Sequence, residues 1–207
     1  MLPGYDTIKE GTQDFLGDSE PNIDKAKELL KQGGWKNGTE LTFYYDVASP
    51  SASVIAQSIQ SDLAKVDVKV KPVPIPDAVW YEPGIGLSPI SKKVDMQLSG
   101  WVADYFDAQD YYQLFTCDAI ADQINAANFC DSDFDTLYTE ALGTIDDDAR
   151  FGIYRQLESM LTGPDGMLPA LPLYQPKETE LVQTWVKGYK KIPSGWVFYD
   201  GISINEH

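Results

Sequence analysis

An indole and a carboxylate lie three residues apart in segment 99–105, which reads SGWVADY. Trp101 follows a glycine and therefore presents a flat apolar face with little crowding, while Asp104 supplies one negative charge. Such a pair suits a ligand that carries an ammonium group beside an apolar or flat portion. A core aromatic at Trp101 and a helix N-cap at Asp104 are the alternative interpretation, and the pattern alone leaves both open.

An enzyme is a second class of function to consider. The one histidine of the chain, His207, is its last residue, so no Ser–His or Cys–His pair is formed in a reliable position. The sequence contains neither a P-loop nor a dinucleotide-binding glycine motif, and no cofactor is expected. Asp104 and Asp107 could serve an acidic hydrolase, but 32 acidic residues produce such pairs by chance. We therefore assign no catalytic residue and no metal ligand.

The indole and the carboxylate follow the end of a predicted strand. Residues 41–47 and 68–73 are rich in branched and aromatic side chains, and an apolar helical stripe lies between them. This order predicts a βαβ unit with two parallel strands. A third strand is predicted at residues 94–101, which places Trp101 and Asp104 where ligands bind in open α/β sheets.

Further elements follow from capping residues and periodicity. Helices are predicted to begin, in chain order, at Asn22, Ser49–Pro50, Ala108, Asp131 or Ser132, and Asp146 or Asp147. Residues 168–174 read as an extended run, and residues 179–185 fit a helix and a strand equally well. The tail from 186 to 207 is β-like near its end.

Bulk composition indicates a folded, acidic protein. The 207 residues are 43% hydrophobic and 12% aromatic, which is enough for a buried core. A net charge of −16 without a basic stripe excludes nucleic acid as a partner. The sequence has no apolar run of about 18 residues, and its first residues, MLPGYD, lack the features of a signal peptide. Any export signal is expected outside this chain.

The two cysteines, Cys117 and Cys130, lie in one loop-like segment. Zinc would need more ligands than this segment offers. A short-range disulfide across the loop is the favoured interpretation, and two buried free thiols are the alternative. A disulfide would imply an oxidising compartment.

Several stretches between residues 22 and 200 carry a family resemblance through their order and spacing. They are DKAKELL (24–30) with GGW (33–35), IAQSIQ (55–60), LAKVDVKV (63–70), DM (95–96), GWVADY (100–105), FD (134–135) with Leu137, Arg150 with Tyr154, PLY (172–174) and VKGY (186–189). Together they resemble the C-terminal half of the family 5 extracellular solute-binding proteins, which include dipeptide-, oligopeptide- and nickel-binding proteins.

The resemblance implies an α/β fold, periplasmic-binding-protein-like of type II. A single C-terminal lobe would contain a central mixed sheet flanked by helices. Residues 1–178 would form this ligand-facing lobe, and residues 179–207 a tail that pairs with the missing N-terminal lobe. In peptide-binding members the acid of the Trp-x-x-Asp segment pairs with the peptide α-ammonium. This implies that Asp104 and Trp101 bind ligand, with Tyr105 as their neighbour.

The implied function is the capture of small peptides for an ABC importer, with a membrane permease as partner. The implied location is periplasmic or extracellular, with the full-length form tethered as a lipoprotein. Cys117 and Cys130 resemble a loop disulfide of some dipeptide-binding members. Leu98 stands where some oligopeptide binders have a basic residue, and an oligosaccharide or another small solute is the alternative ligand. Arg150 and Arg155 are expected away from the Trp101 loop, which leaves no guanidinium for a ligand carboxylate.

Overall fold

The computed structural model describes residues 21–76, 94–105, 107–122, 124–163, 165–174, 179–191 and 196–205. The chain divides into two compact units. The sheet unit comprises residues 18–100 and 117–129. The helical unit comprises residues 1–17, 101–116 and 130–207.

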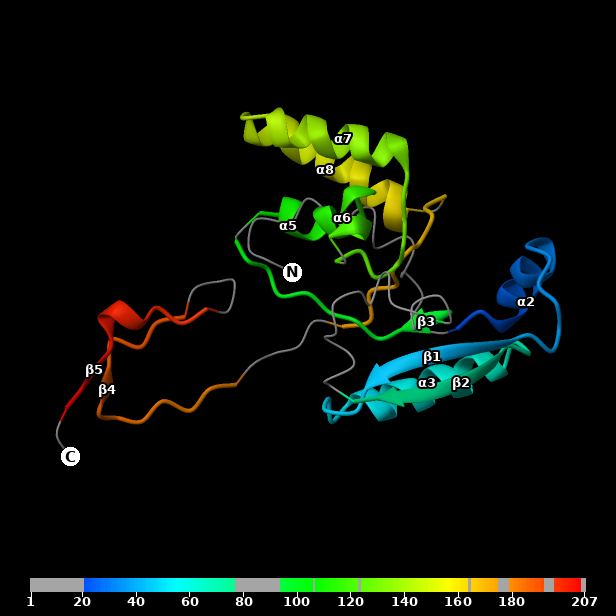
Figure 1. The fold of residues 1–207 in the computed structure, drawn as a ribbon, viewed down its shortest axis with the longest axis horizontal. Coiled ribbons are helices and arrows are strands. Elements are labelled where there is room, and N and C mark those ends of the chain that lie inside the picture. The colour runs from blue at the N-terminus through cyan, green and yellow to red at the C-terminus, as the bar shows by residue number, and fades with distance from the viewer. Residues whose placement is uncertain are drawn as a thin grey trace. The chain divides into compact units, whose positions relative to one another are not determined.

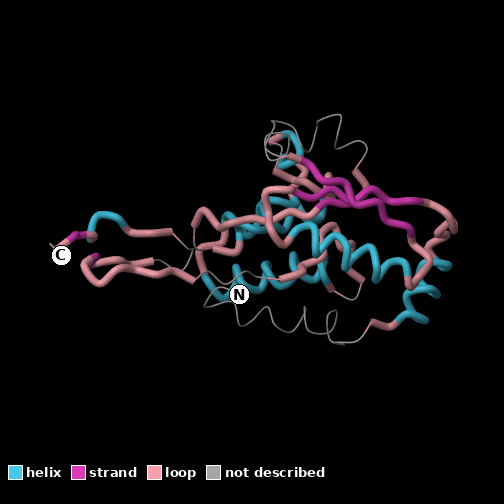
Figure 2. Tube along the Cα trace, turned by 90° about the horizontal axis from the view of Figure 1, so that it is seen from below, coloured by secondary structure: helices cyan, strands magenta, loops and turns pink. Residues whose placement is uncertain are grey.

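Parallel strands form the sheet of the sheet unit, in the spatial order β2-β1-β3 (Figure 1). These strands are β1 (Glu40–Asp46), β2 (Lys69–Ile75) and β3 (Met96–Gln97). Helix α3 (Ala52–Ala64) connects β1 to β2 and packs on both strands. The predicted βαβ unit is therefore confirmed, and Figure 2 shows its strands side by side. Pairing in this sheet is parallel throughout the described residues.

Helix α2 (Ile23–Gln32) begins as predicted, because the Asn22 side chain accepts a hydrogen bond from the Lys25 backbone N–H at 2.9 Å. Gly34 then adopts a φ of +74°, a conformation that favours glycine. Apolar residues of α2 and α3 pack with the sheet around a buried core. That core consists of Phe43, Ala56, Val66, Val68 and Val70.

The third strand is shorter than the prediction for residues 94–101. The Asp95 carboxylate accepts hydrogen bonds from both the backbone N–H and the hydroxyl of Thr42, at 2.7 and 2.8 Å. A side-chain oxygen therefore accepts the hydrogen bond from the Thr42 N–H of β1, which a backbone carbonyl of a neighbouring strand would otherwise accept. Beyond β3, the Leu98 N–H still donates to Tyr44 O at 2.9 Å.

The outer edge of β2 carries two prolines. The carbonyl of Ile75 accepts from Val47 N at 3.1 Å and so faces β1, which makes Pro72 and Pro74 face outward by alternation. Proline has no backbone N–H, so this edge lacks two donors. The Gln60 side chain donates to the outward carbonyl of Val70 at 2.7 Å.

The helical unit is built around a helical hairpin of α7 (Ser132–Gly143) and α8 (Asp147–Thr162) (Figure 1). Both helices have the predicted N-caps, Asp131 and Asp146, whose carboxylates accept hydrogen bonds from first-turn N–H groups. Short helices α5 (Gln109–Tyr112) and η3 (Gln113–Phe115) precede them, and α6 (Asp118–Ala121) belongs to the sheet unit. The buried apolar residues of the hairpin are Phe134, Ala141, Ile153, Tyr154, Leu157 and Leu161.

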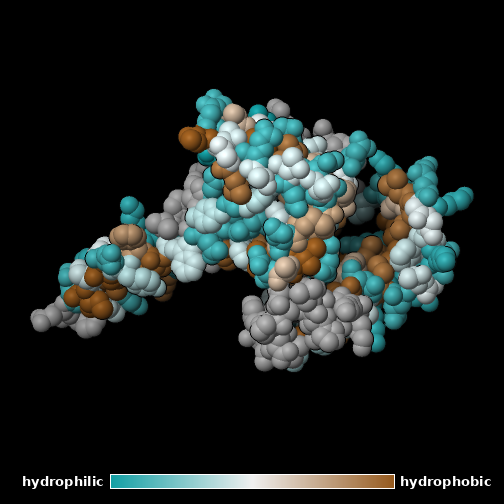
Figure 3. Space-filling view, turned by 45° about the horizontal axis from the view of Figure 1, so that its top comes forward, coloured by the Kyte–Doolittle hydropathy of each residue, from teal (hydrophilic) through white to brown (hydrophobic). Residues whose placement is uncertain are grey.

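The C-terminal segment (residues 168–207) contains little helix or strand in its described residues. Strands β4 (Val186–Lys187) and β5 (Ser203–Ile204) pair antiparallel, with η4 (Tyr199–Gly201) just before β5. No helix or strand is formed at 168–174 or in the described residues 179–185. Large apolar side chains of this segment are exposed, and Figure 3 shows the resulting hydrophobic surface. They include Leu181, Trp196, Phe198, Tyr199 and Ile204.

Candidate ligand-binding site

The site loop (residues 101–105) holds the three residues predicted to bind ligand. Trp101 is half-buried, and its indole Nε1–H donates to Asp110 Oδ2 at 2.7 Å. The backbone N–H of Asp104 donates to the same oxygen at 3.1 Å. One carboxylate oxygen from the first turn of α5 thus fixes both the indole and the backbone of the acid.

The side chain of Asp104 itself is exposed. Within the described part of the chain, no hydrogen bond or ion pair engages its carboxylate. Asp104 is not a helix cap either, because the N-cap residue of α5 is Ala108, and Asp107 Oδ1 accepts from the Gln109 N–H at 2.9 Å. The alternative of a capping role is therefore wrong for Asp104.

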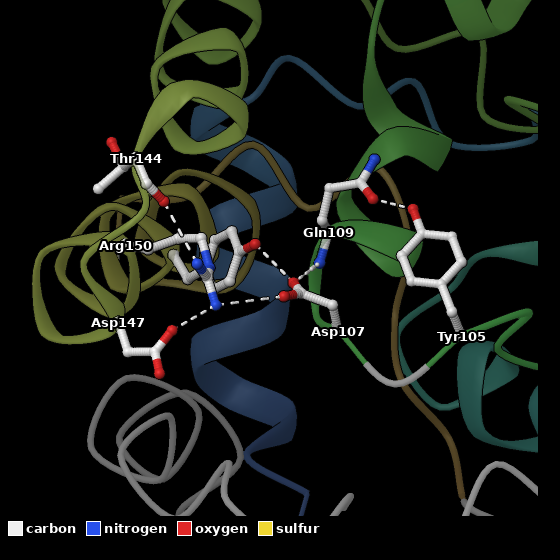
Figure 4. A network of polar contacts seen from close by, with 7 residues as sticks. Tyr105, Asp107, Gln109, Thr144, Asp147 and Arg150 are labelled. Atoms are coloured by element: carbon white, nitrogen blue, oxygen red, sulfur yellow. Dashed lines mark hydrogen bonds and ion pairs between the residues drawn. The ribbon is translucent and has the colours of Figure 1, made fainter.

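Asp107 lies two residues beyond the site loop and contacts helix α8 (Figure 4). Its Oδ1 also accepts from the Tyr154 hydroxyl at 2.5 Å, and its Oδ2 lies 3.5 Å from Arg150 Nη2. Arg150 also donates to Thr144 O at 3.2 Å and pairs with Asp147 at 2.7 Å. The first turn of α8 thus reaches Asp107, two residues beyond the site loop, and in the described residues Arg150 makes no hydrogen bond or ion pair with the loop itself.

Arg150 remains charged in this setting. Desolvation disfavours the charged guanidinium and lowers its pKa. The charges of Asp107, Tyr154 and Asp147 act in the opposite direction and outweigh desolvation, so the pKa of Arg150 is raised overall. Because Arg150 is already engaged by Asp107, Asp147 and the Thr144 carbonyl, the hydrogen bonds that it makes are internal. The expectation that it offers no clamp to a ligand carboxylate stays a prediction.

Tyr105 completes the predicted trio and is 43% exposed. Its hydroxyl donates to Gln109 Oε1, and the Gln109 amide donates to the Tyr138 hydroxyl on α7. Burial raises the pKa of Tyr105 to about 12, and the charges of Asp110, Asp107 and Asp104 act in the same direction. The loop therefore lies in a negative field, which favours a cationic ligand group.

The predicted disulfide is present, since Cys117 and Cys130 are both disulfide-bonded. In the described ranges, no cluster of His, Cys, Asp and Glu side chains is arranged to hold a metal ion. None of the described helices combines the length and the apolar character needed to cross a bilayer.

The parallel strands with their helical crossover define an α/β fold. The family described as bacterial extracellular solute-binding proteins, family 5 (middle region), matches residues 1–123. The chain belongs to this family of solute-binding proteins.

Individual relatives agree with this assignment. The chain is 32% identical over 189 residues to the probable ABC transporter periplasmic-binding protein SapA of Escherichia coli, covering 89% of this chain and 33% of that protein. It is 30% identical over 175 residues to a dipeptide-binding protein of Pseudomonas aeruginosa, covering 82% of this chain and 31% of that protein. The chain thus spans about a third of the length of the curated relatives that it matches.

Solved structures define the fold class. The dipeptide-binding protein from Pseudoalteromonas sp. SM9913, in complex with Met-Leu, has a TM-score of 0.74 at 27% identity. The similarity covers 88% of this chain and 35% of that protein. NikA from Staphylococcus aureus has a TM-score of 0.65 at 18% identity, which bears on the fold alone. The fold is that of the type II periplasmic binding proteins, as predicted.

Proposed function

We propose that this chain is the ligand-facing lobe of the substrate-binding component of an ABC importer, and that the full-length protein binds small peptides by their α-ammonium group. The observation that carries the proposal is the exposed Asp104 carboxylate, on a loop whose Trp101 indole and Asp104 backbone are both held by Asp110. Relatives named for dipeptide binding and peptide transport support a peptide as ligand.

Asp104 would pair with the ammonium group, and Trp101 would pack beside it. A charge-assisted contact of this kind contributes about 1.5–3 kcal/mol, which corresponds to roughly ten- to a hundredfold in affinity. Tyr105 borders the pair, and its own hydrogen bond to Gln109 holds the phenol at the edge of the loop. Binding and release, without turnover, would be the activity of this site.

The remaining parts of the proposal concern the whole protein. Residues 1–178 would form the ligand-facing lobe, and residues 179–207 would pair with an N-terminal lobe that completes the cleft. The exposed apolar side chains of the C-terminal segment are consistent with such a partner. The full-length protein would work outside the cytoplasm, periplasmic or extracellular and tethered as a lipoprotein, and would deliver its ligand to a membrane permease.

Calorimetry on the full-length protein tests the role of Asp104. Asp104→Asn should weaken the binding of a dipeptide about tenfold or more, because the amide keeps the shape and loses the charge. Asp148→Asn, which neutralises an exposed acid on α8, is the matched control and should leave affinity unchanged. Unchanged affinity in Asp104→Asn would remove this residue from the role.

Mass spectrometry of ligands that co-purify with the full-length protein tests the ligand class. Short peptides with free amino ends are the expected result. An oligosaccharide or another solute without an amine, bound as tightly as a peptide, would contradict the proposed ligand and favour the neutral-solute alternative.

A further inference from the structure

Asp110 is a carboxylate in the interior of the helical unit. Its exposed fraction is 0%, and it is one of the largest fully buried side chains in the described residues. Charged side chains are rarely buried without a compensating partner, because the loss of hydration is costly. Asp110 therefore needs a reason for its position.

The hydrogen bonds of Asp110 divide between its two oxygens. Oδ2 accepts from the Trp101 indole at 2.7 Å and from the Asp104 backbone N–H at 3.1 Å. Oδ1 accepts from the Gln113 side-chain amide at 2.9 Å, and the same amide donates to the Asp110 backbone carbonyl at 3.0 Å. Gln113 thus holds the carboxylate, and the carboxylate holds the two residues of the site loop.

These partners are neutral N–H donors. Over the described ranges, no ion pair with lysine or arginine engages Asp110. A buried anion that is held only by neutral donors adds less to stability than a well-packed apolar side chain of similar size. Stability alone therefore does not account for an acid at this position, whereas control of the site loop does.

We propose that Asp110 is a positioning residue for ammonium recognition: it fixes the Trp101 ring and the Asp104 backbone in the receiving geometry and adds a second negative charge behind them. This inference rests on the function proposed for Asp104. The buried charge is felt at the loop surface, because Asp110 is the largest charge contribution to the raised pKa of Tyr105, ahead of Asp107 and Asp104.

A double-mutant cycle in the full-length protein tests the proposal, with the dipeptide Met-Leu and its N-acetylated form as probes. Asp110→Asn keeps the shape, removes the charge and turns an amide N–H₂ toward one of the present donors. We expect Met-Leu binding to weaken about tenfold when Asp104 is intact, and about threefold or less in the Asp104→Asn background. The affinity for N-acetyl-Met-Leu, which has no ammonium group, should stay unchanged.

A purely structural role gives a different pattern. Asp110→Asn would then weaken both probes equally, and its effect would be the same in both backgrounds, which would overturn the inference while leaving the role of Asp104 intact. If Asp104→Asn leaves Met-Leu affinity unchanged, or if the wild-type protein does not bind Met-Leu, the proposed function fails and this inference fails with it.

Two further measurements distinguish the proposed role of Asp110 from a loss of binding caused by misfolding of Asp110→Asn. Gln113→Ala keeps Asp110 and removes the amide that holds Oδ1, so a weakening of about threefold for Met-Leu alone is expected. In ¹H–¹⁵N spectra, the indole N–H signal of Trp101, assigned with Trp101→Phe, should move in Asp110→Asn. An unmoved indole signal in a folded variant would contradict the proposed hydrogen bond.

Discussion

Removing the hydroxyl of Tyr154 is the cleanest perturbation of the contact between Asp107 and α8. This hydroxyl donates to Asp107 Oδ1 at 2.5 Å, and Tyr154 is only 2% exposed. Hydrogen bonds to a charged group contribute about 1.5–3 kcal/mol. Because the Asp107 side chain is 29% exposed, water can replace the lost donor, so the lower end applies. Tyr154→Phe should therefore cost about 1.5 kcal/mol of stability.

Urea denaturation and thermal unfolding measure this loss. For a protein of this size, about 1.5 kcal/mol lowers the melting temperature by roughly 3–6 °C. Tyr199→Phe removes a hydroxyl from a side chain that is 75% exposed and should change the free energy of unfolding by less than about 0.5 kcal/mol. In a cycle with Asp107→Asn, the two losses should be less than additive. Additive losses, or a stability equal to that of wild type, would refute the reasoning.

Two other predictions concern the core and the response to pH. Leu157→Ala, at a fully buried position in α8, should cost about 2–5 kcal/mol in urea denaturation, whereas Leu142→Ala, at an exposed position of α7, should cost less than about 0.5 kcal/mol; equal costs would contradict the packing described. Because folding raises the pKa of Tyr105 from 10.0 to about 12, the native state favours the protonated phenol. That stabilisation is complete below about pH 10 and is lost as the pH rises to about 12. Between these two pH values, the free energy of unfolding of the wild-type protein should therefore fall more steeply than that of Tyr105→Phe. Parallel slopes would contradict the raised pKa of Tyr105.

Helix starts were predictable from the sequence because capping is local. At Asn22, Asp131 and Asp146 the side chain bonds N–H groups two or three residues ahead, so the local sequence carries the full signal. The start of α3 shows the limit of such a signal. Its N-cap position is Ser51, just after the predicted Ser49–Pro50, and Ser51 makes no side-chain capping bond.

The length of β3 was not predictable in the same way. A strand extends only as far as its partner offers ladder bonds, and here Asp95 takes the Thr42 N–H with a side-chain oxygen. The alternation of apolar and polar residues at 94–101 therefore predicts which segment joins the sheet, but not how many of its residues pair with β1.

Trp101, Asp104 and Tyr105 could be proposed from the sequence because they follow a predicted strand end and share one short segment, and their role in ligand binding stays a prediction. Asp110 was missed because α5 has a single turn, and the buried Ala108 and Tyr112 suggest a face that excludes it. Two of its partners, Trp101 and the backbone of Asp104, lie upstream in an irregular loop, where periodicity carries no information. The contact of Arg150 with Asp107 was not predictable either, because it depends on how α8 packs.

The proline-bearing edge of β2 has a consequence for the behaviour of the protein in concentrated solution. An intruding strand from another molecule would find no amide hydrogens at Pro72 and Pro74, and would find the Val70 carbonyl already occupied by Gln60. This side of the sheet is thus a poor template for edge-to-edge aggregation and fibril growth.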